Sequence, residues 1–517
     1  MAKKLEKVWE FGDFQTPRNL ATEAVTYLQN IKPNFSPQTI IEPTCGVGSF
    51  LLSAANHFPT APMVVGCEID HNYVDVLTRD IESRGDTNRF TVMESDFFKY
   101  DWKSMLADAP RPLLVIGNPP WVTSADIGRL KGSNLPEKSN FQKYSGLEAV
   151  TGKANFDISE WMLIHLIEWM SQEGDCLAML CKSSVARKVL KHAWKNGQHL
   201  TKCSITQINA MKHFGAAVDA CFFVVTKGNS SDTKTCAVYE NFDSDKPIYS
   251  IGFVDGVMLS NADKFSKYRA FYGSEKNYTW RSGVKHDCSK VMELKISGNC
   301  IVNGDGESVD IEETFKFPLL KSSDLGNRQT DSSRYYMLVT QKKVGGDTSD
   351  IRQAAPKTWL YLLSNSDKLD ARGSIIYKNN PRFSVFGVGD YTFSQWKVAI
   401  SGFYKKLEFQ TVGPMNGKPV VFDDTVYFLS AETKEEAEFL CSLLNSEPCQ
   451  NFLSSMVFWD EKRPITAEIL KRLNIRAVAE FLEQSSTYDD FNNPVQRPLF
   501  REPTQSLRNQ SEIVGSR

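Results

Sequence analysis

The sequence contains no apolar run long enough to cross a membrane, and its polar start, MAKKLEKVWEFGDF, lacks the apolar core of a signal peptide. It also lacks a CxxC pair, and its 11 cysteines are scattered and odd in number, which argues against a disulfide framework and a zinc site. The net charge is only −2, so the chain has no large excess of either charge. Binding to nucleic acid would therefore require a local basic patch. We therefore expect a cytoplasmic protein with no membrane partner and no bound metal.

The length of the chain and its pattern of apolar and polar stretches predict the domain organisation. A chain of 517 residues is too long for one ordinary core. From about residue 20 to 230, short apolar runs alternate with helix-like stretches, which is typical of an α/β protein with a doubly wound sheet. Later segments are irregular, and the last ones are polar and rich in Pro, Gln, Asn and Ser. We expect a first domain over 1–240, a second, mixed α+β domain over 241–475 and a flexible tail over 476–517.

A glycine turn follows the first predicted strand, in TIIEPTCGVGSFLLSAA. Gly46 and Gly48 allow the backbone to approach a ligand closely, which indicates a nucleotide-like ligand. The acidic Glu42 at the strand end would repel a pyrophosphate, so a cationic ligand fits better than a dinucleotide. A tight turn without a ligand is the alternative interpretation.

The next two predicted strands also end in acidic side chains. Glu68, in VVGCEID, suits the two hydroxyls of a ribose. Asp96, in MESDFF, suits an adenine amino group, and Phe97 after it is placed to cover the ring. Each acid alone is compatible with a solvated strand end or a cap, but the three strand ends together indicate an adenosine site.

The segment VIGNPPWVTS, residues 115–124, carries a buried apolar strand into two prolines. Proline cannot donate to a sheet and biases the preceding residue toward extended geometry. Asn118-Pro119-Pro120-Trp121 is therefore predicted to leave the sheet as a stiff turn. Stiffness at a strand end suits a site that grips a substrate.

These segments, in this order, resemble the gamma class of DNA adenine-N6 methyltransferases. The resemblance rests on FQTP (14–17), EPTCGVGSF (42–50), CEID (67–70), SDFF (95–98) and NPPW (118–121), and continues through NFDISEWML (155–163) and HFGAAVDACFFVV (213–225). More loosely, recognition domains of such enzymes, including type IIG restriction-modification proteins, resemble FPLLKSSDL (317–325), WKVAISGFYKK (396–406) and DDTVYFL (423–429).

The resemblance implies a Rossmann-like S-adenosylmethionine-dependent methyltransferase domain and a C-terminal target recognition domain. Its substrate would be an adenine flipped out of a specific sequence in double-stranded DNA, and a cognate restriction endonuclease or another defence protein would be a partner. The implied cofactor site comprises Thr16, Pro17, Glu42, Gly46, Gly48, Glu68, Ile69, Asp96 and Phe97.

The same resemblance assigns the NPPW turn to catalysis. The Asn118 side-chain oxygen and the Pro119 carbonyl would accept hydrogen bonds from the adenine amine and aim its lone pair at the methyl donor. Pro120 stiffens the turn, Trp121 would stack on the flipped base, and Phe214 would supply a second aromatic face. Both aromatic residues are also compatible with a role in the core.

The stretch from 372 to 406 is the best candidate for DNA contact, because its basic residues are interleaved with aromatics and glycines and accompanied by a single acid, Asp390. A β-rich scaffold with solvated lysines is the alternative interpretation. The basic residues are Arg372, Lys378, Arg382, Lys397, Lys405 and Lys406.

Other functions stay open at this point. EPCQ at 447–450 echoes the Pro-Cys-Gln of cytosine-C5 methyltransferases, but it lies far downstream of the predicted sheet. Asp287 with Glu293 and Lys295 has the residue types of a nuclease site, which a type IIG enzyme with fused cleavage would need. Methyltransferases of RNA or of protein glutamine use a similar turn, and a specificity subunit would keep the fold without catalysis.

Overall fold

The computed structural model of the chain describes residues 15–85, 87–122, 157–230, 234–298 and 300–493. The chain divides into two compact units, here called the first and the second unit. The first unit is Met1–Lys267 with Ser454–Glu461, and the second is Tyr268–Leu453 with Lys462–Arg517. Among the described helices, none combines the length and the apolar character that crossing a membrane requires.

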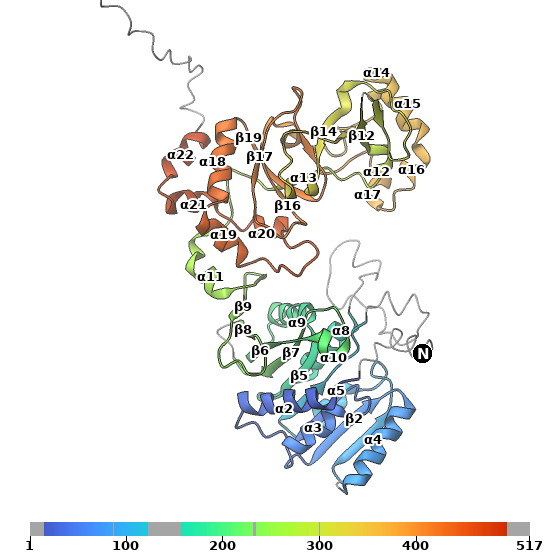
Figure 1. Cartoon of the computed structure of the whole chain (residues 1–517), viewed down its shortest axis with the longest axis vertical. Coiled ribbons are helices and arrows are strands. Elements are labelled where there is room, and N and C mark those ends of the chain that lie inside the picture. The colour runs from blue at the N-terminus through green and yellow to red at the C-terminus, as the bar shows by residue number, and fades with distance from the viewer. Residues whose placement is uncertain (1–14, 86, 123–156, 231–233, 299, 494–517) are drawn as a thin grey trace, which may run out of the picture. The chain divides into compact units, whose positions relative to one another are not determined.

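One large sheet forms the centre of the first unit (Figure 1). Its strands are β1 (Thr39–Glu42), β2 (Met63–Glu68), β3 (Phe90–Glu94), β4 (Leu113–Gly117), β5 (Cys176–Lys182), β6 (Leu200–Ile208), β7 (Ala220–Lys227), β8 (Thr235–Tyr239), β9 (Tyr249–Val254) and β10 (Val257–Leu259). The order is β10-β9-β8-β6-β7-β5-β4-β1-β2-β3, and the run β5-β4-β1-β2-β3 is parallel. The chain reverses direction along the sheet between β1 and β4, so a topological switch point for ligand binding lies at their carboxyl ends.

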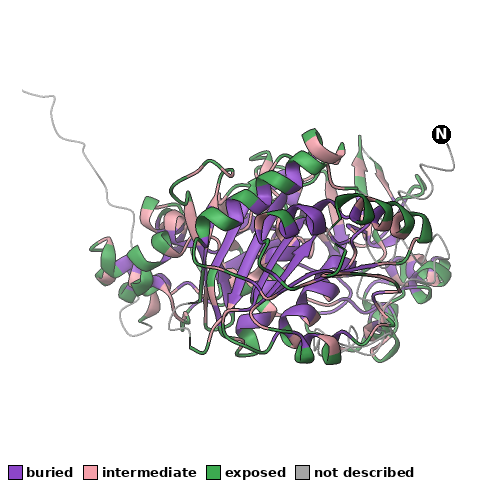
Figure 2. Cartoon of the chain, turned by 90° about the horizontal axis from the view of Figure 1, so that it is seen from below, coloured by how far each residue is buried: buried purple, intermediate pink, exposed green. Residues whose placement is uncertain are grey.

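Helices cover both faces of this sheet, which confirms the predicted doubly wound α/β fold. Ile40 and Leu114 pack with α2 and α3 on one face, whereas Ile41 and Val115 pack with α5, α8 and α9 on the other. This alternation follows from the period of two along a strand, and Figure 2 shows the strands buried beneath helices whose outer sides are exposed. The helices are α2 (Arg18–Ile31), α3 (Ser49–His57), α4 (His71–Arg84), α5 (Trp102–Asp108), α8 (Ile158–Trp169), α9 (Ser183–Lys195), α10 (Ala210–Phe214) and α11 (Ala262–Lys267).

The first unit extends beyond residue 240, where the sequence predicted a domain boundary. Strand β9 pairs antiparallel with β8, and β10 with β9, so both strands continue the same sheet. The segment Ser454–Glu461 also packs with the first unit, because Asn261 N–H donates to the Ser455 carbonyl at 3.0 Å. The boundary between the two units therefore lies at Lys267 and not at residue 240. The physical reason is that β9 pairs with the edge of β8, which would otherwise be unpaired.

The second unit is the expected mixed α+β structure, with two separate sheets. Its strands are β11 (Arg281–Ser282), β12 (Glu293–Ser297), β13 (Cys300–Val302), β14 (Lys316–Leu320), β15 (Tyr335–Leu338), β16 (Trp396–Ser401), β17 (Gln410–Val412), β18 (Val421–Phe422) and β19 (Val426–Ala431). One sheet has the order β11-β19-β16-β17 and the other β13-β12-β15-β14-β18.

Helices of the second unit continue into the expected tail. Helix α22 places Tyr488 fully inside the unit, and the Tyr488 hydroxyl donates to Glu275 Oε1 at 2.6 Å. The flexible tail predicted from residue 476 is therefore folded through residue 493, because an aromatic anchor lies within this polar sequence; residues 494–517 lie outside the described part. The helices are α12 (Ser289–Met292), α13 (Ser322–Gly326), α14 (Ile351–Ala354), α15 (Pro356–Ser364), α16 (Ser366–Asp370), α17 (Ile375–Lys378), α18 (Lys434–Leu444), α19 (Glu447–Ser454), α20 (Ala467–Leu470), α21 (Ile475–Phe481) and α22 (Ser485–Asn492).

Candidate active site

The glycine turn between β1 and α3 lies at the switch point of the first sheet. Gly46 has φ +50° and Gly48 has φ +79°, a left-handed backbone that side chains rarely adopt. A side-chain carbon built on Gly46 would also lie 2.5 Å from the Gln15 side chain, and one on Gly48 would lie 2.4 Å from Leu77. Both glycines are thus required by the turn, as the sequence predicted.

Glu68, at the end of β2, holds this turn. Its Oε2 accepts a hydrogen bond from Gly46 N–H at 2.8 Å, while Oε1 accepts from Ile69 and Asp70 N–H, both at 2.9 Å. The Glu68 carbonyl accepts from Ser95 N–H at 2.9 Å, so the end of β3 is tied to the same residue. The structure therefore brings together the predicted strand ends around one residue, Glu68, and Ile69 takes part through its backbone.

Glu42, at the end of β1, is buried beside the start of the NPPW turn. Only 3% of the residue is exposed, and its Oε2 accepts from Leu51 N–H at 2.7 Å. Burial raises the pKa of Glu42 well above its ordinary value, and the negative charge of Glu68 adds to this. A side-chain carbon on Gly117 would lie 3.2 Å from Glu42 Cγ, so Glu42 lies against the residue that precedes Asn118.

The remaining predicted cofactor residues differ in their surroundings. The Thr16 carbonyl accepts from the Ser49 hydroxyl at 2.8 Å, and Pro17 precedes α2, so both lie beside the start of α3. Asp96 is half-buried, and its Oδ1 accepts from Phe98 N–H at 3.0 Å. Phe97 lies in the core, where its ring centroid is 5.3 Å from that of Trp102, so its role as a cover for a ligand stays a prediction.

The NPPW turn leaves β4 as predicted, and its aromatic ring meets Phe214. Trp121 is 6% exposed, and its ring centroid lies 5.2 Å from that of Phe214, at an interplanar angle of 67°. Phe214 ends α10, which Gly215 terminates with φ +65°. The two predicted aromatic faces are therefore neighbours, but they touch edge to face, and a base can enter between them only after the rings separate.

One residue that sequence patterns did not single out also contacts this turn, and a second is its ion-pair partner. Lys182, at the end of β5, donates to the Trp121 carbonyl at 3.2 Å and to Asp157 Oδ2 at 2.6 Å. Asp157 precedes α8 and caps it. The available signals were an acid directly before a predicted helix and a lysine directly after an apolar strand.

The predicted DNA-binding stretch does not form one basic surface, because Arg372 and Lys397 are buried. Arg372 donates to three backbone carbonyls, including that of Ser384 at 2.8 Å, and its guanidinium stacks over Tyr377. Lys397 donates to the carbonyls of Ser394 at 2.5 Å and Val420 at 3.0 Å. Their assignment to DNA contact was wrong, since each basic group is used to satisfy carbonyls inside the second unit.

The other four basic residues of that stretch are exposed. Arg382 forms an ion pair with Asp370 at 2.6 Å, which reduces its availability to a phosphate. Lys378, Lys405 and Lys406 have no ion pair among the described residues. Their contact with DNA stays a prediction.

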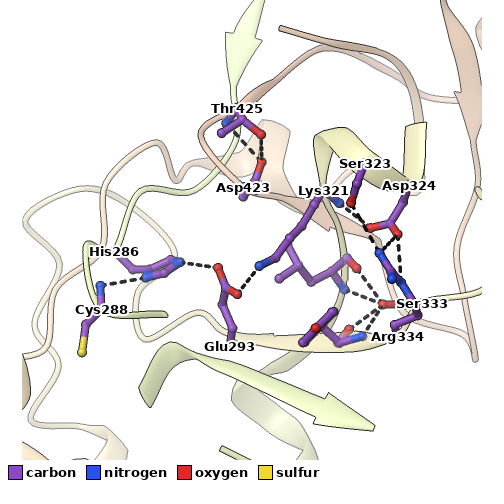
Figure 3. Close-up of polar contacts among 12 residues, drawn as sticks. His286, Cys288, Glu293, Lys321, Ser323, Asp324, Ser333, Arg334, Asp423 and Thr425 are labelled. Atoms are coloured by element: carbon purple, nitrogen blue, oxygen red, sulfur yellow. Dashed lines mark hydrogen bonds and ion pairs between the residues drawn. The ribbon is translucent and has the colours of Figure 1, made fainter. Parts of the chain in front are cut away.

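One residue of the suggested nuclease site, Glu293, belongs to an internal network (Figure 3). Glu293 Oε1 lies 3.2 Å from His286 Nε2, and Oε2 pairs with Lys321. Burial alone would raise the pKa of Glu293, but the hydrogen bonds from these two partners lower it. No group of three or more His, Cys, Asp or Glu side chains within the described residues is arranged to hold a metal ion.

The Pro-Cys-Gln echo has an equally plain explanation. Cys449 lies on α19 of the second unit and is fully buried, and burial raises the pKa of its thiol. A cysteine that attacks a base must reach it as a thiolate. Cys449 is buried with a raised pKa, so it is a core residue and not a nucleophile.

Comparisons with known proteins identify the family of this arrangement. The family described as N-6 DNA Methylase matches residues 3–248. The type II methyltransferase M.NspV of Nostoc sp. (strain ATCC 29411 / PCC 7524) is 44% identical over 473 residues, 92% of this chain and 98% of the relative. The type II methyltransferase M.XamI of Xanthomonas campestris pv. amaranthicola is 33% identical over 117 residues, 23% of this chain and 21% of the relative. The type IIL restriction-modification enzyme MmeI, solved in complex with DNA, has a TM-score of 0.49 at 12% identity and covers 95% of this chain and 68% of its own.

The similarity to M.NspV extends over nearly the full length of both proteins, so it includes the second unit as well as the first. The resemblance carried by the five motifs is therefore confirmed, and RNA or protein glutamine is not the favoured substrate. The chain belongs to the type II DNA methyltransferases of the N-6 DNA methylase family.

Proposed function

We propose that the first unit transfers the methyl group of S-adenosylmethionine to the N6 amine of an adenine in double-stranded DNA, with the Asn118–Trp121 turn as its catalytic element. The observation that carries the proposal is the meeting of two turns at the switch point, where Glu42 lies against Gly117. One turn offers an acidic, glycine-lined cradle, and the other offers two fixed acceptors. Family membership supports the cofactor and the DNA substrate.

The residues of the cradle fit an adenosylated sulfonium. Gly46 and Gly48 form a tight, left-handed turn, and Glu68 is held at the rim of that turn. Glu68 would take the ribose hydroxyls, and Asp96 would take the adenine amino group. The Glu68 carboxylate supplies negative charge at the cradle, which favours a positively charged ligand and disfavours a pyrophosphate. Burial raises the pKa of Glu42 and so disfavours a second charge there.

S-Adenosylmethionine, when bound, supplies the methyl group: the S–CH3 bond breaks as the N–CH3 bond forms, a neutral thioether is left, and an amine proton passes to water. The task of the protein is to position the amine. Asn118 Oδ1 and the Pro119 carbonyl would accept its two N–H groups and direct the nitrogen lone pair away from the ring. Because prolines follow Asn118, these acceptors are held at a fixed spacing.

Trp121 and Phe214 would hold the flipped base. Stacking on an aromatic ring contributes about 1–3 kcal/mol per base, which offsets the cost of roughly a few kcal/mol for leaving the duplex. Since the two rings lie in edge-to-face contact, the entering base would replace their contact with each other.

DNA would be contacted through the second unit at a surface around α13, here called the α13 surface. Tyr404 lies against α13, because a side-chain carbon on Gly326 would meet its ring at 2.3 Å, and Gln410 Nε2 donates to the Leu325 carbonyl at 2.6 Å. These contacts bring the loop with Lys405 and Lys406 next to the loop that follows α13. The basic residues of the α13 surface are Arg328, Arg334, Lys405, Lys406 and Arg463, the last stacked over Phe403 at 4.8 Å.

Arg334 is the best oriented of these residues. Its Nε and Nη2 donate to Asp324 Oδ1 at 3.1 and 2.6 Å, and Asp324 is almost fully buried (Figure 3). The guanidinium side chain is nevertheless 57% exposed, so a fixed cation faces solvent. Such a group loses little conformational entropy when it meets a phosphate or a guanine edge.

The protein would act within a restriction-modification or related defence system, with a cognate endonuclease that cleaves unmethylated sites. The experiment for the proposed function incubates the full chain with methyl-labelled S-adenosylmethionine and, in parallel, duplex DNA, single-stranded DNA and RNA. Digestion to nucleosides should give labelled N6-methyladenine from duplex DNA at a reproducible sequence. Label in methylcytosine, or only in RNA, would overturn the proposal.

A further inference from the structure

A single ammonium group joins the Asn118–Trp121 turn to the end of strand β5. Lys182 Nζ donates to the backbone carbonyl of Trp121 at 3.2 Å and to Asp157 Oδ2 at 2.6 Å. The two side chains are largely shielded from solvent, with 22% of Lys182 and 8% of Asp157 exposed. An ion pair with this degree of shielding is weakened less by salt than one on the surface.

Asp157 is itself fixed by its own helix. Its Oδ1 accepts from the Ser159 backbone N–H at 3.1 Å and from the Ser159 hydroxyl at 2.5 Å, which caps α8. Ile158 N–H then donates to the Val122 carbonyl at 2.9 Å. The start of α8 is therefore bonded to the turn directly and through Lys182.

Lys182 also lies beside the segment that follows Phe214. In the sheet it pairs with Ala220 of β7, and Ser183 N–H donates to the Asp219 carbonyl at 2.9 Å. Lys182 and Asp219 line a cavity of about 780 Å³, together with Met211 of α10. Lys182 thus contacts the Trp121 carbonyl and also pairs with the strand that follows Phe214 in the chain.

We propose that Lys182 and Asp157 are positioning residues for the Asn118–Trp121 turn. This inference rests on the proposed function and identifies the residues that hold the catalytic turn in place. The ammonium holds the Trp121 carbonyl, and so fixes the backbone that also presents the Pro119 carbonyl and the Trp121 ring. Asp157 supplies the opposite charge, so that Lys182 does not leave an uncompensated cation beside an amine that gains positive charge during transfer.

Lys182→Met removes the donor and keeps an apolar stem of similar length. A shift of the turn by about 1 Å is enough to lower a rate by about 100-fold, so the single-turnover methylation rate should fall by about 10- to 100-fold. The affinities for the cofactor and for DNA should stay within about threefold of the wild type, because Lys182 belongs to neither proposed binding site. With 2-aminopurine at the target position, less extrahelical base should be detected.

The matched control is Lys188→Met. Lys188 lies on α9, a short distance along the chain from Lys182, and pairs with Glu160 of α8 at 3.2 Å. This pair joins α9 to α8 rather than to the turn, so its removal tests stability while the bond from Lys182 to Trp121 stays in place. Thermal unfolding of both variants separates a loss of fold from a loss of positioning.

Conservative and combined variants complete the test. Lys182→Arg keeps a cation and should recover most of the rate, even if Lys182→Met unfolds. Asp157→Asn combined with Lys182→Met should cost no more than the worse single variant, because the two groups act as one unit. Methylation by Lys182→Met at the wild-type rate, or an equal fall in rate in the Lys188→Met control, would overturn the positioning role. A wild-type chain that labels no DNA would overturn the proposed function as well, so the two failures are distinguishable.

Discussion

The Glu68 carboxylate accepts a hydrogen bond from the backbone N–H of Gly46 at 2.8 Å. The residue predicted to bind the ribose is therefore also a structural support of the glycine turn. This dual role changes the expected effect of its removal, because truncation takes away the acceptor that holds the left-handed backbone of the glycine turn.

Glu68→Ala should weaken binding of S-adenosylhomocysteine at least about tenfold and also lower the melting temperature by a few degrees, since removal of a hydrogen bond costs about 1 kcal/mol. Glu68→Gln keeps one acceptor and turns the other oxygen into a donor, so the melting temperature should fall less than in Glu68→Ala while affinity still falls. Calorimetric titration and thermal unfolding give both numbers. Glu94→Gln, at the exposed end of β3, is the control. An unchanged affinity in Glu68→Ala would remove Glu68 from the cofactor site.

Lys397 gives a prediction for stability against pH. Burial lowers the pKa of Lys397 to about 7, so the folded protein loses this proton at a pH where the unfolded chain keeps it. The buried Lys397 ammonium therefore destabilises the folded protein by its full amount below pH 7. This destabilisation decreases as the pH rises from 7 toward 10.5, the ordinary pKa of lysine. The free energy of unfolding of Lys397→Met, relative to the wild type, should therefore decrease between pH 7 and pH 10. Urea unfolding at several pH values measures it, and a difference that is constant or grows with pH contradicts the prediction.

The α13 surface predicts a change in salt dependence. Lys405→Ala with Lys406→Ala should weaken DNA binding for all sequences and lower the slope of log K against log salt by about 0.9 for each phosphate that the variant no longer neutralises. Cofactor affinity should not change. The control is Lys357→Ala with Lys368→Ala, which removes two exposed cations from α15 and α16. Binding isotherms that superimpose on the wild type at every salt concentration would place DNA on another face.

The fold of the first unit was predictable because local pattern decides it. Apolar strands that alternate with helices leave few topologies, and the acids and glycines follow strands whose carboxyl ends meet at one edge. Local pattern reaches its limit after residue 240, where the short strands β9 and β10 look like a new domain. Only the pairing of β9 with β8, and of β10 with β9, shows that they extend the same sheet.

The site residues were predictable where a short local motif identifies them. They were not predictable where the relevant contact joins segments that are distant in the sequence. Asn118 and the prolines were recognisable from the turn alone. Lys182 and Asp157 required knowledge that β5, α8 and the turn lie side by side. The number of basic residues in a stretch likewise cannot distinguish Lys397, a buried residue of β16, from Lys405, which is exposed.

Trp121→Ala separates capture of the base from transfer. Without the Trp121 ring, the base would stack on Phe214 alone, so both 2-aminopurine fluorescence at the target and the methylation rate should fall. Leu77→Ala, beside the cofactor turn, serves as a control for reduced packing. A Trp121→Ala enzyme that flips the base normally would show that Trp121 is only a core residue.

The most direct test is single-turnover formation of N6-methyladenine by Asn118→Ala at saturating cofactor and DNA. The variant keeps both prolines and the tryptophan but lacks an acceptor for the amine. Transfer should therefore fall by at least about 100-fold while the affinities for S-adenosylhomocysteine and DNA stay near those of the wild type, the pattern of a group that acts mainly in the transition state. A rate close to that of the wild type would contradict the assignment of the NPPW turn to catalysis.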